Sequence, residues 1–186
     1  MKVLLIDFYD SFTFNIQHYL LGLGVVVDVF EDKELDLDEV QKYDVIVFSP
    51  GPGLPSQTKN LFSVLERYGN TKKILGVCLG MQGIVEFYGG SIYNQKTVKH
   101  GVSEKLIVLS ENQLFKEMPK SFQVGLYHSW AVDVSNTDLF EVLARSEEGV
   151  IMAVKHKDLN VFGVQFHPES VLTENGKNIL SNFLFN

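Results

Sequence analysis

The stretch Ile74-Leu75-Gly76-Val77-Cys78-Leu79-Gly80-Met81-Gln82 joins an apolar run that favours a β-strand to an apolar pattern that favours a helix. Cys78, the only cysteine in the sequence, therefore lies at the turn between the two elements. Gly76 and Gly80 flank it, and small neighbours permit the sharp turn of a nucleophile elbow, which exposes the side chain. The positive end of the following helix would favour the thiolate. We interpret Cys78 as a nucleophile, although a lone cysteine is more often a core residue.

The composition is typical of a globular protein that binds neither nucleic acid nor membranes. The 186 residues are 45% hydrophobic and 21% charged, and we expect them to form a single domain over residues 1–186. The net charge of −7 offers no basic face to phosphates, and no stretch approaches the length of a membrane span. One cysteine cannot form an internal disulfide, so we expect a cytoplasmic protein.

Strand-like and helix-like patterns alternate in the first half of the chain. Apolar runs rich in β-formers predict strands at residues 2–7, 25–30, 44–49 and 73–77. Apolar residues at helical spacing lie between them over residues 12–23 and 61–68, and Asp36 with Glu39 predicts a brief capped helix. Continuous apolar strands separated by helices indicate a parallel sheet that is covered on both faces.

The second half is mostly strand-like. The expected strands are at residues 105–109, 122–132, 139–145, 150–156 and 161–166, and a helical pattern over residues 172–185 follows. We therefore predict an α/β fold: a mostly parallel central sheet flanked by helices, with an added antiparallel strand region in the second half. Ligands of open parallel sheets bind beyond the carboxyl ends of the strands, where Asp7, Ser49 and Cys78 lie.

A thiol nucleophile needs a base, and His167 is the best candidate among the five histidines. It lies in Gln165-Phe166-His167-Pro168-Glu169, where the proline keeps the chain extended, so that His167 and Glu169 project to the same side. A carboxylate beside an imidazole orients the ring and stabilises its protonated form. The pair could be a plain turn at a strand end, but together with Cys78 it forms a candidate Cys-His-Glu triad.

Acyl transfer also needs a site for the oxyanion. The loop Pro50-Gly51-Pro52-Gly53 follows a strand, and its alternating residues make a stiff backbone that a ligand can approach closely. The amides of Gly51 and Leu79 could converge on an oxyanion there. A rigid loop without a ligand is the alternative. The loop lacks the G-x-x-x-x-G-K-[ST] pattern of a phosphate loop.

Together these segments resemble a known family. Pro50-Gly51-Pro52-Gly53, the Gly76-to-Gln82 segment and Gln165-Phe166-His167-Pro168-Glu169 look like the three signatures of the class I, triad-type glutamine amidotransferases, over nearly the whole chain. Residues 7–15 and Tyr127-His128-Ser129-Trp130 further resemble motifs of the chorismate-utilising branch, the subunits of anthranilate synthase and 4-amino-4-deoxychorismate synthase. The resemblance implies the three-layer, flavodoxin-like fold of that family.

The resemblance also implies a role for each matched residue. Cys78 would attack the side-chain amide of L-glutamine and form a γ-glutamyl thioester, with His167 as base and then acid and Glu169 orienting it. The amides of Gly51 and Leu79 would stabilise the oxyanion. The residues that would bind glutamine are Gly51, Pro52, Gly53, Gln82, Ser129 and Trp130.

A partner follows from the same resemblance. The chain has no second domain to consume ammonia, so a separate synthase subunit would bind chorismate, receive the ammonia and need Mg²⁺. We expect no cofactor in this chain and no metal site, because no cysteine and histidine cluster has ligand spacing. We expect His18 to be a surface or packing residue and His156 to be solvated, the latter because lysines flank it.

Three positions depart from the pattern of that branch. Phe8 stands in place of an asparagine, Trp130 of a commoner leucine, and Val102 of a basic residue. None touches the proposed triad, and the sequence does not choose between the two synthases or exclude service to both.

Two other readings stay open: a cysteine hydrolase of the same fold that acts on peptides or γ-glutamyl compounds, and a non-catalytic binding subunit.

Overall fold

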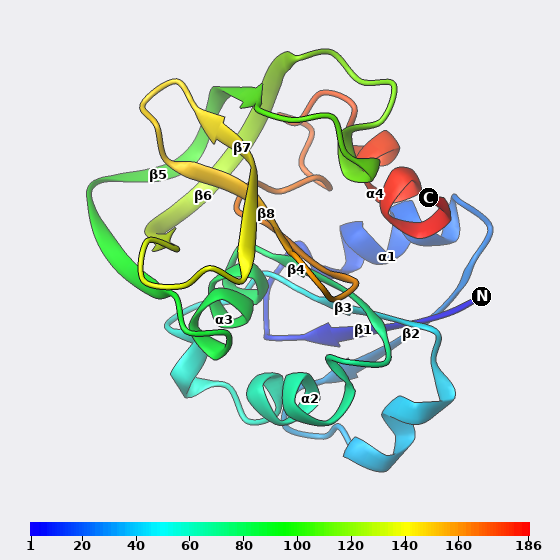
Figure 1. The fold of residues 1–186 in the computed structure, drawn as a ribbon. Coiled ribbons are helices and arrows are strands. Elements are labelled where there is room, and N and C mark those ends of the chain that lie inside the picture. Colours follow the sequence, from blue (N-terminus) through cyan, green and yellow to red (C-terminus); the bar gives the residue numbers. More distant parts are fainter.

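The apolar runs of the sequence form the strands of one nine-stranded sheet in the computed structural model, which describes residues 1–186 (Figure 1). The elements are β1 (Lys2–Asp7), α1 (Thr13–Leu21), β2 (Val26–Glu31), η1 (Leu37–Lys42), β3 (Val45–Phe48), η2 (Pro55–Gln57), α2 (Leu61–Tyr68), β4 (Lys73–Val77), α3 (Leu79–Phe87), β5 (Ser91–Val108), η3 (Gln113–Phe115), β6 (Ser121–Asp133), β7 (Phe140–Ser146), β8 (Ile151–His156), β9 (Val161–Val164) and α4 (Gly176–Phe185). The strand order is β2-β1-β3-β4-β9-β8-β7-β5-β6. Pairings from β2 to β9 are parallel and those from β9 to β6 are antiparallel, so the predicted parallel sheet with an antiparallel addition is confirmed.

The buried strands of the parallel half separate two apolar cores. Along β1, Val3 and Leu5 point into one core while Leu4 and Ile6 point into the other, as the period of a strand requires. Helices α1 and α4 complete the first core, and α2 and α3 complete the second (Figure 1). Because β1, β3 and β4 pair in parallel, the loops that follow them meet at one edge of the sheet.

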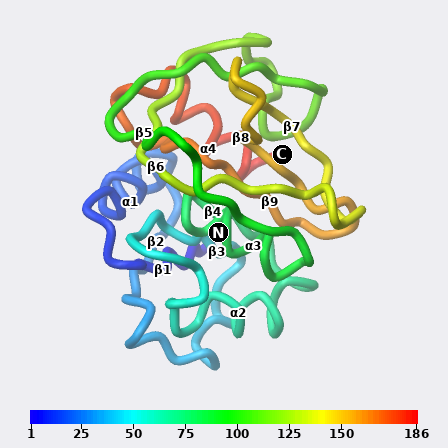
Figure 2. The backbone as a smooth tube through the Cα atoms, turned by 90° about the vertical axis from the view of Figure 1, so that its left-hand side faces the viewer, coloured from blue at the N-terminus to red at the C-terminus, as the bar shows by residue number.

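Strands β5 and β6 pair along most of their length and form a long ribbon in the antiparallel half. The sequence predicted this ribbon only in part. β5 begins at Ser91, whereas the apolar pattern predicted a strand from residue 105. Most side chains over residues 91–104 are exposed, so no apolar alternation marks this stretch. Figure 1 and Figure 2 both show β7 and β8 in the upper half of the molecule and α2 in the lower half.

Two predicted helices differ from the observed ones. The brief helix is the 3₁₀ turn η1, in which Asp36 accepts a hydrogen bond from the Asp38 N–H but Glu39 pairs with Lys42 instead of closing a capping box. The final helix, α4, begins at Gly176 rather than at residue 172. No helix has the length and apolar character needed to cross a membrane.

The prediction of a solvated His156 is wrong. The side chain is buried, its ring packs edge-on against Tyr88 and Phe140, and its Nδ1 accepts a hydrogen bond from the Leu159 N–H. Burial lowers the pKa of His156 accordingly. Lys155, the neighbour within β8, lies on the opposite face of the strand, and Lys157 lies beyond its end.

Candidate active site

Cys78 lies between the end of β4 and the start of α3, in a backbone conformation that side chains rarely adopt. Its φ is 52° and its ψ is −103°, and such strain is typical of a nucleophile elbow. Gly76 packs so closely on the next turn that a Cβ there would lie 2.4 Å from the Gly80 carbonyl carbon. The two glycines therefore fix the turn, and the turn holds the sulfur at the carboxyl edge of the sheet.

His167 and Glu169 form a buried pair beyond the end of β9. Nδ1 of His167 lies 2.7 Å from Oε1 of Glu169, and both side chains are at most 2% exposed. The His167 N–H donates to the Gly125 carbonyl and the Thr173 hydroxyl donates to the His167 carbonyl, which fixes the backbone of the segment. Since Glu169 holds Nδ1 and Nε2 has no hydrogen-bond partner, Nε2 is the nitrogen free for chemistry.

The electrostatics of the site favour a protonated imidazole. Burial opposes the charge on His167, but its side-chain interactions with Cys78 and Glu169 outweigh burial and raise the pKa of His167 to about 10. The nucleophile, the histidine and the carboxylate that the sequence predicted are thus neighbours. An imidazolium beside a cysteine sulfur stabilises the thiolate, which is the reactive form.

The proline-glycine loop reaches the same edge of the sheet. A Cβ on Gly51 would lie 2.6 Å from the Leu79 side chain and 2.7 Å from the Cβ of Phe8, so only glycine fits here. The Phe8 N–H donates to the Ser49 hydroxyl, which ties this loop to the end of β1. A cleft of about 170 Å³ adjoins the loop and is lined in part by Pro52 and Leu79. The predicted oxyanion residues Gly51 and Leu79 are therefore in contact.

Gln82 and Trp130, both predicted to bind substrate, also meet. Nε2 of Gln82 donates to the Trp130 carbonyl at 3.1 Å and to Oε1 of Gln165 at 3.2 Å. Ser129 precedes Trp130 on β6. The antiparallel half of the sheet thus brings its main chain to the first turn of α3, beside Cys78.

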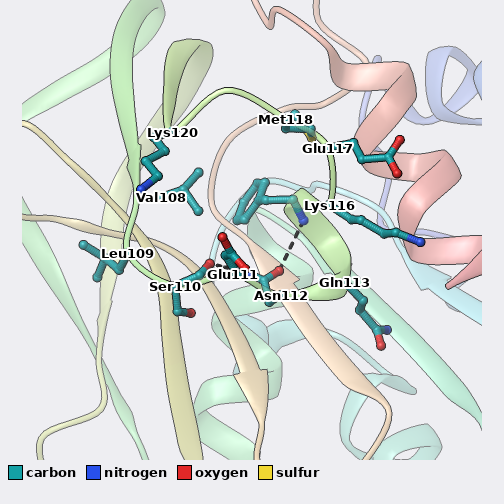
Figure 3. Close-up of a pocket in the computed structure, with 11 residues that line it drawn as sticks. Val108, Leu109, Ser110, Glu111, Asn112, Gln113, Lys116, Glu117, Met118 and Lys120 are labelled. Atoms are coloured by element: carbon teal, nitrogen blue, oxygen red, sulfur yellow. Dashed lines mark hydrogen bonds between the residues drawn. The ribbon is translucent and has the colours of Figure 1, made fainter.

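The cavity in Figure 3 lies away from these residues. It measures about 640 Å³, is open to solvent on one side and is lined by residues from the connection between β5 and β6. Figure 3 shows Lys116 and Glu117 directed toward the outer side of this loop. No predicted site residue lines the cavity, and the chain has no group of three or more histidine, cysteine or acidic side chains that could hold a metal ion.

Comparison with known proteins identifies the family. The sequence model of "Glutamine amidotransferase class-I" matches residues 4–186. The chain belongs to the class I glutamine amidotransferases. It is 44% identical to a Haemophilus influenzae protein provisionally named anthranilate synthase component II, over 99% of this chain and 96% of that one. It is 39% identical to aminodeoxychorismate synthase component 2 of Klebsiella aerogenes, over 98% of this chain and 97% of that one.

A solved structure agrees on the fold of this amidotransferase. The crystal structure of a glutamine amidotransferase from Thermotoga maritima matches with a TM-score of 0.78, covering 99% of this chain and 96% of that one. At 17% identity this likeness speaks for the fold alone. The resemblance read from the sequence and the predicted amidotransferase fold are both confirmed.

The candidate site also contains residues whose contacts the sequence did not predict. The rings of Phe12 and Tyr127 meet the imidazole of His167 edge-on, at centroid distances of 5.6 and 4.8 Å. Gln165 is fully buried, and its Nε2 donates to the Cys78 sulfur at 3.5 Å. Phe12 and Tyr127 fall in the segments that resemble the chorismate branch and Gln165 in the histidine signature, but no local pattern says what their side chains touch.

Proposed function

We propose that this amidotransferase hydrolyses L-glutamine to glutamate and ammonia with Cys78, His167 and Glu169, and that it supplies the ammonia to a chorismate-using synthase. One observation carries the proposal: a cysteine held in a strained elbow lies beside a buried histidine whose Nδ1 is bound by a carboxylate and whose Nε2 is unpartnered. A cysteine beside a histidine that a carboxylate orients is the arrangement that acyl transfer by a thiolate uses.

The reaction proceeds through two acyl transfers. The Cys78 thiolate attacks the side-chain carbonyl carbon of glutamine, and the amides of Gly51 and Leu79 stabilise the oxyanion. The C–N bond breaks as His167 gives its proton to the leaving nitrogen, and a γ-glutamyl thioester forms with release of ammonia. His167 then takes a proton from water as the water attacks the thioester. Glutamate leaves, and the Cys78 thiolate and the His167 imidazolium are restored.

The remaining predicted residues bind the amino-acid end of the substrate. Gln82, Ser129, Trp130 and the loop of Gly51, Pro52 and Gly53 supply amide and main-chain groups, which match a zwitterion without a basic patch. These steps use only side chains and backbone, so we propose that the chain needs no cofactor. A Mg²⁺ requirement would belong to the synthase.

The relatives support the choice of partner. They are named as component II of anthranilate synthase and of aminodeoxychorismate synthase. We infer a component I type synthase as the partner and a cytoplasmic location, and the residues of this chain leave open whether the product is anthranilate, aminodeoxychorismate or both.

Glutamine hydrolysis by the purified chain, with and without each candidate synthase chain, tests the proposal. We expect slow release of ammonia alone, a sharp rise with one partner, and none with Cys78→Ala. A chain that cleaves γ-glutamyl peptides equally well with or without a synthase would instead be a hydrolase of the same fold. A folded chain with no activity toward either substrate would be a binding subunit.

A further inference from the structure

We propose that Gln165 is a positioning residue that holds the nucleophile and the substrate-binding amide of Gln82 at the same time. The effect of Gln165 on glutamine binding rests on the proposed function, whereas its effect on the Cys78 sulfur does not. Gln165 has no exposed surface, and its N–H donates to the Met152 carbonyl of β8, so its backbone is fixed at the end of β9.

The Trp130 main-chain carbonyl determines which atom donates and which accepts in each of these hydrogen bonds. The Trp130 carbonyl can only accept, so the group of Gln82 that lies 3.1 Å from it must be the amide nitrogen. The same nitrogen lies 3.2 Å from the side-chain amide of Gln165, which must therefore present its oxygen to Gln82. The Gln165 nitrogen is then left for the Cys78 sulfur, 3.5 Å away. The orientation of Gln165 follows from its neighbours and is not an arbitrary choice of rotamer.

The far end of the network lies on β6. Nδ1 of His128 is 2.8 Å from the same Trp130 carbonyl, and burial lowers the pKa of His128 to about 4, so the ring is neutral and donates through Nδ1. Two donors therefore converge on this carbonyl. A chain of hydrogen bonds runs from His128 through Trp130, Gln82 and Gln165 to the nucleophile.

Two consequences follow for catalysis. An N–H directed at the sulfur stabilises the thiolate more than the thiol, so Gln165 favours the reactive form of Cys78. Because Gln82 gives its nitrogen to Trp130 and Gln165, its oxygen is the atom left for a substrate. An amide oxygen fits the ammonium group of an amino acid, so Gln165 also sets the affinity for glutamine.

The rate at which iodoacetamide alkylates the only cysteine at neutral pH measures the first effect without glutamine or a partner. Steady-state kinetics of the complex with the synthase measure the second. Gln165→Met keeps the volume and removes both contacts; we expect alkylation to slow about tenfold and KM for glutamine to rise. Gln165→Glu keeps an acceptor for Gln82 but loses the donor, so alkylation should slow while KM changes less. The glutamate variant also provides the test at the sulfur if the methionine variant does not fold.

Gln113→Met, in the remote β5–β6 connection, is the matched control and should change neither quantity. An unchanged alkylation rate in a folded Gln165 variant overturns the proposal at the sulfur, and an unchanged KM in Gln165→Met overturns it at Gln82. A slower alkylation in a chain that hydrolyses no glutamine with any partner would refute the proposed function and leave the effect of Gln165 on Cys78 standing.

Discussion

The parallel and antiparallel halves of the sheet contribute to the site in different ways. The parallel half positions atoms through its backbone: Cys78 is strained, and Gly51 and Gly76 are packed too tightly for any Cβ. The antiparallel half contributes groups from β6, among them the ring of Tyr127 and the carbonyl of Trp130. A tightly packed or strained backbone does not tolerate an added side chain, whereas a side-chain contact can be weakened without moving the backbone. Substitutions in the parallel half should therefore abolish function or folding, and those in the antiparallel half should tune it.

The largest effect is expected at the elbow itself. Cys78→Gly should lower glutamine hydrolysis roughly 10⁴-fold or more, because the nucleophile is gone. The same change should raise the free energy of unfolding by about 1 kcal/mol, since glycine adopts a φ of 52° without strain. Urea unfolding of Cys78→Ala provides the matched control, because alanine lacks the sulfur but keeps the strain. Equal stability of the two variants would contradict a strained elbow.

Glu169→Gln tests the pair at the boundary of the two halves. We expect hydrolysis to fall by roughly 10²–10⁴, because the imidazolium loses its carboxylate. The pKa of His167 is raised to about 10, so its protonation stabilises the fold fully below pH 6.5, and this stabilisation is lost as the pH rises through 10. Thermal unfolding from pH 6 to 10 should therefore decline less steeply in the variant. Parallel curves for the two proteins would mean that Glu169 does not hold the proton on His167.

Alanine substitutions at two glycines, one in each half, compare the halves by the free energy of unfolding alone. Gly76→Ala places a Cβ against backbone of α3 and should lower the free energy of unfolding by about 3 kcal/mol or more. Gly149, in the turn between β7 and β8, has a φ of +86° with open space around it, so Gly149→Ala should cost only about 1 kcal/mol of backbone strain. Denaturant titration of both variants measures the two losses of unfolding free energy. Similar values would contradict the contrast between the halves.

The same contrast explains how much could be predicted from the sequence. The strand β4 was predicted to the residue because it is buried on both faces and reads as one apolar run. Local motifs predicted Cys78, His167 and Glu169 as a candidate triad, and the structure makes these three side chains neighbours. Residues 91–104 of β5 were missed because an exposed edge ribbon needs no apolar face.

Long-range side-chain contacts explain the remaining differences. Gln165 belongs to a recognisable signature, but its partners lie 83 and 87 positions away in the sequence. No periodicity encodes which amide faces which sulfur. His156 was a different case, because it shares a strand face with the apolar Val154, two positions earlier, and the prediction gave more weight to the flanking lysines.

The smallest predicted effect concerns His128, whose charge behaves in the opposite way to that of His167. Burial, aided by the charges of His167 and Lys99, lowers the pKa of His128 to about 4. Its neutral form is the folded form, so its contribution to stability is present above pH 6.5 and is lost as the pH falls toward 4. His128→Asn retains a donor for the Trp130 carbonyl and does not titrate. Between pH 6.5 and 4 the variant should lose about 1–2 kcal/mol less unfolding free energy than the wild type, as measured by urea titration. An acid loss as steep as that of the wild type would show that the interior of the antiparallel half tolerates a charged histidine.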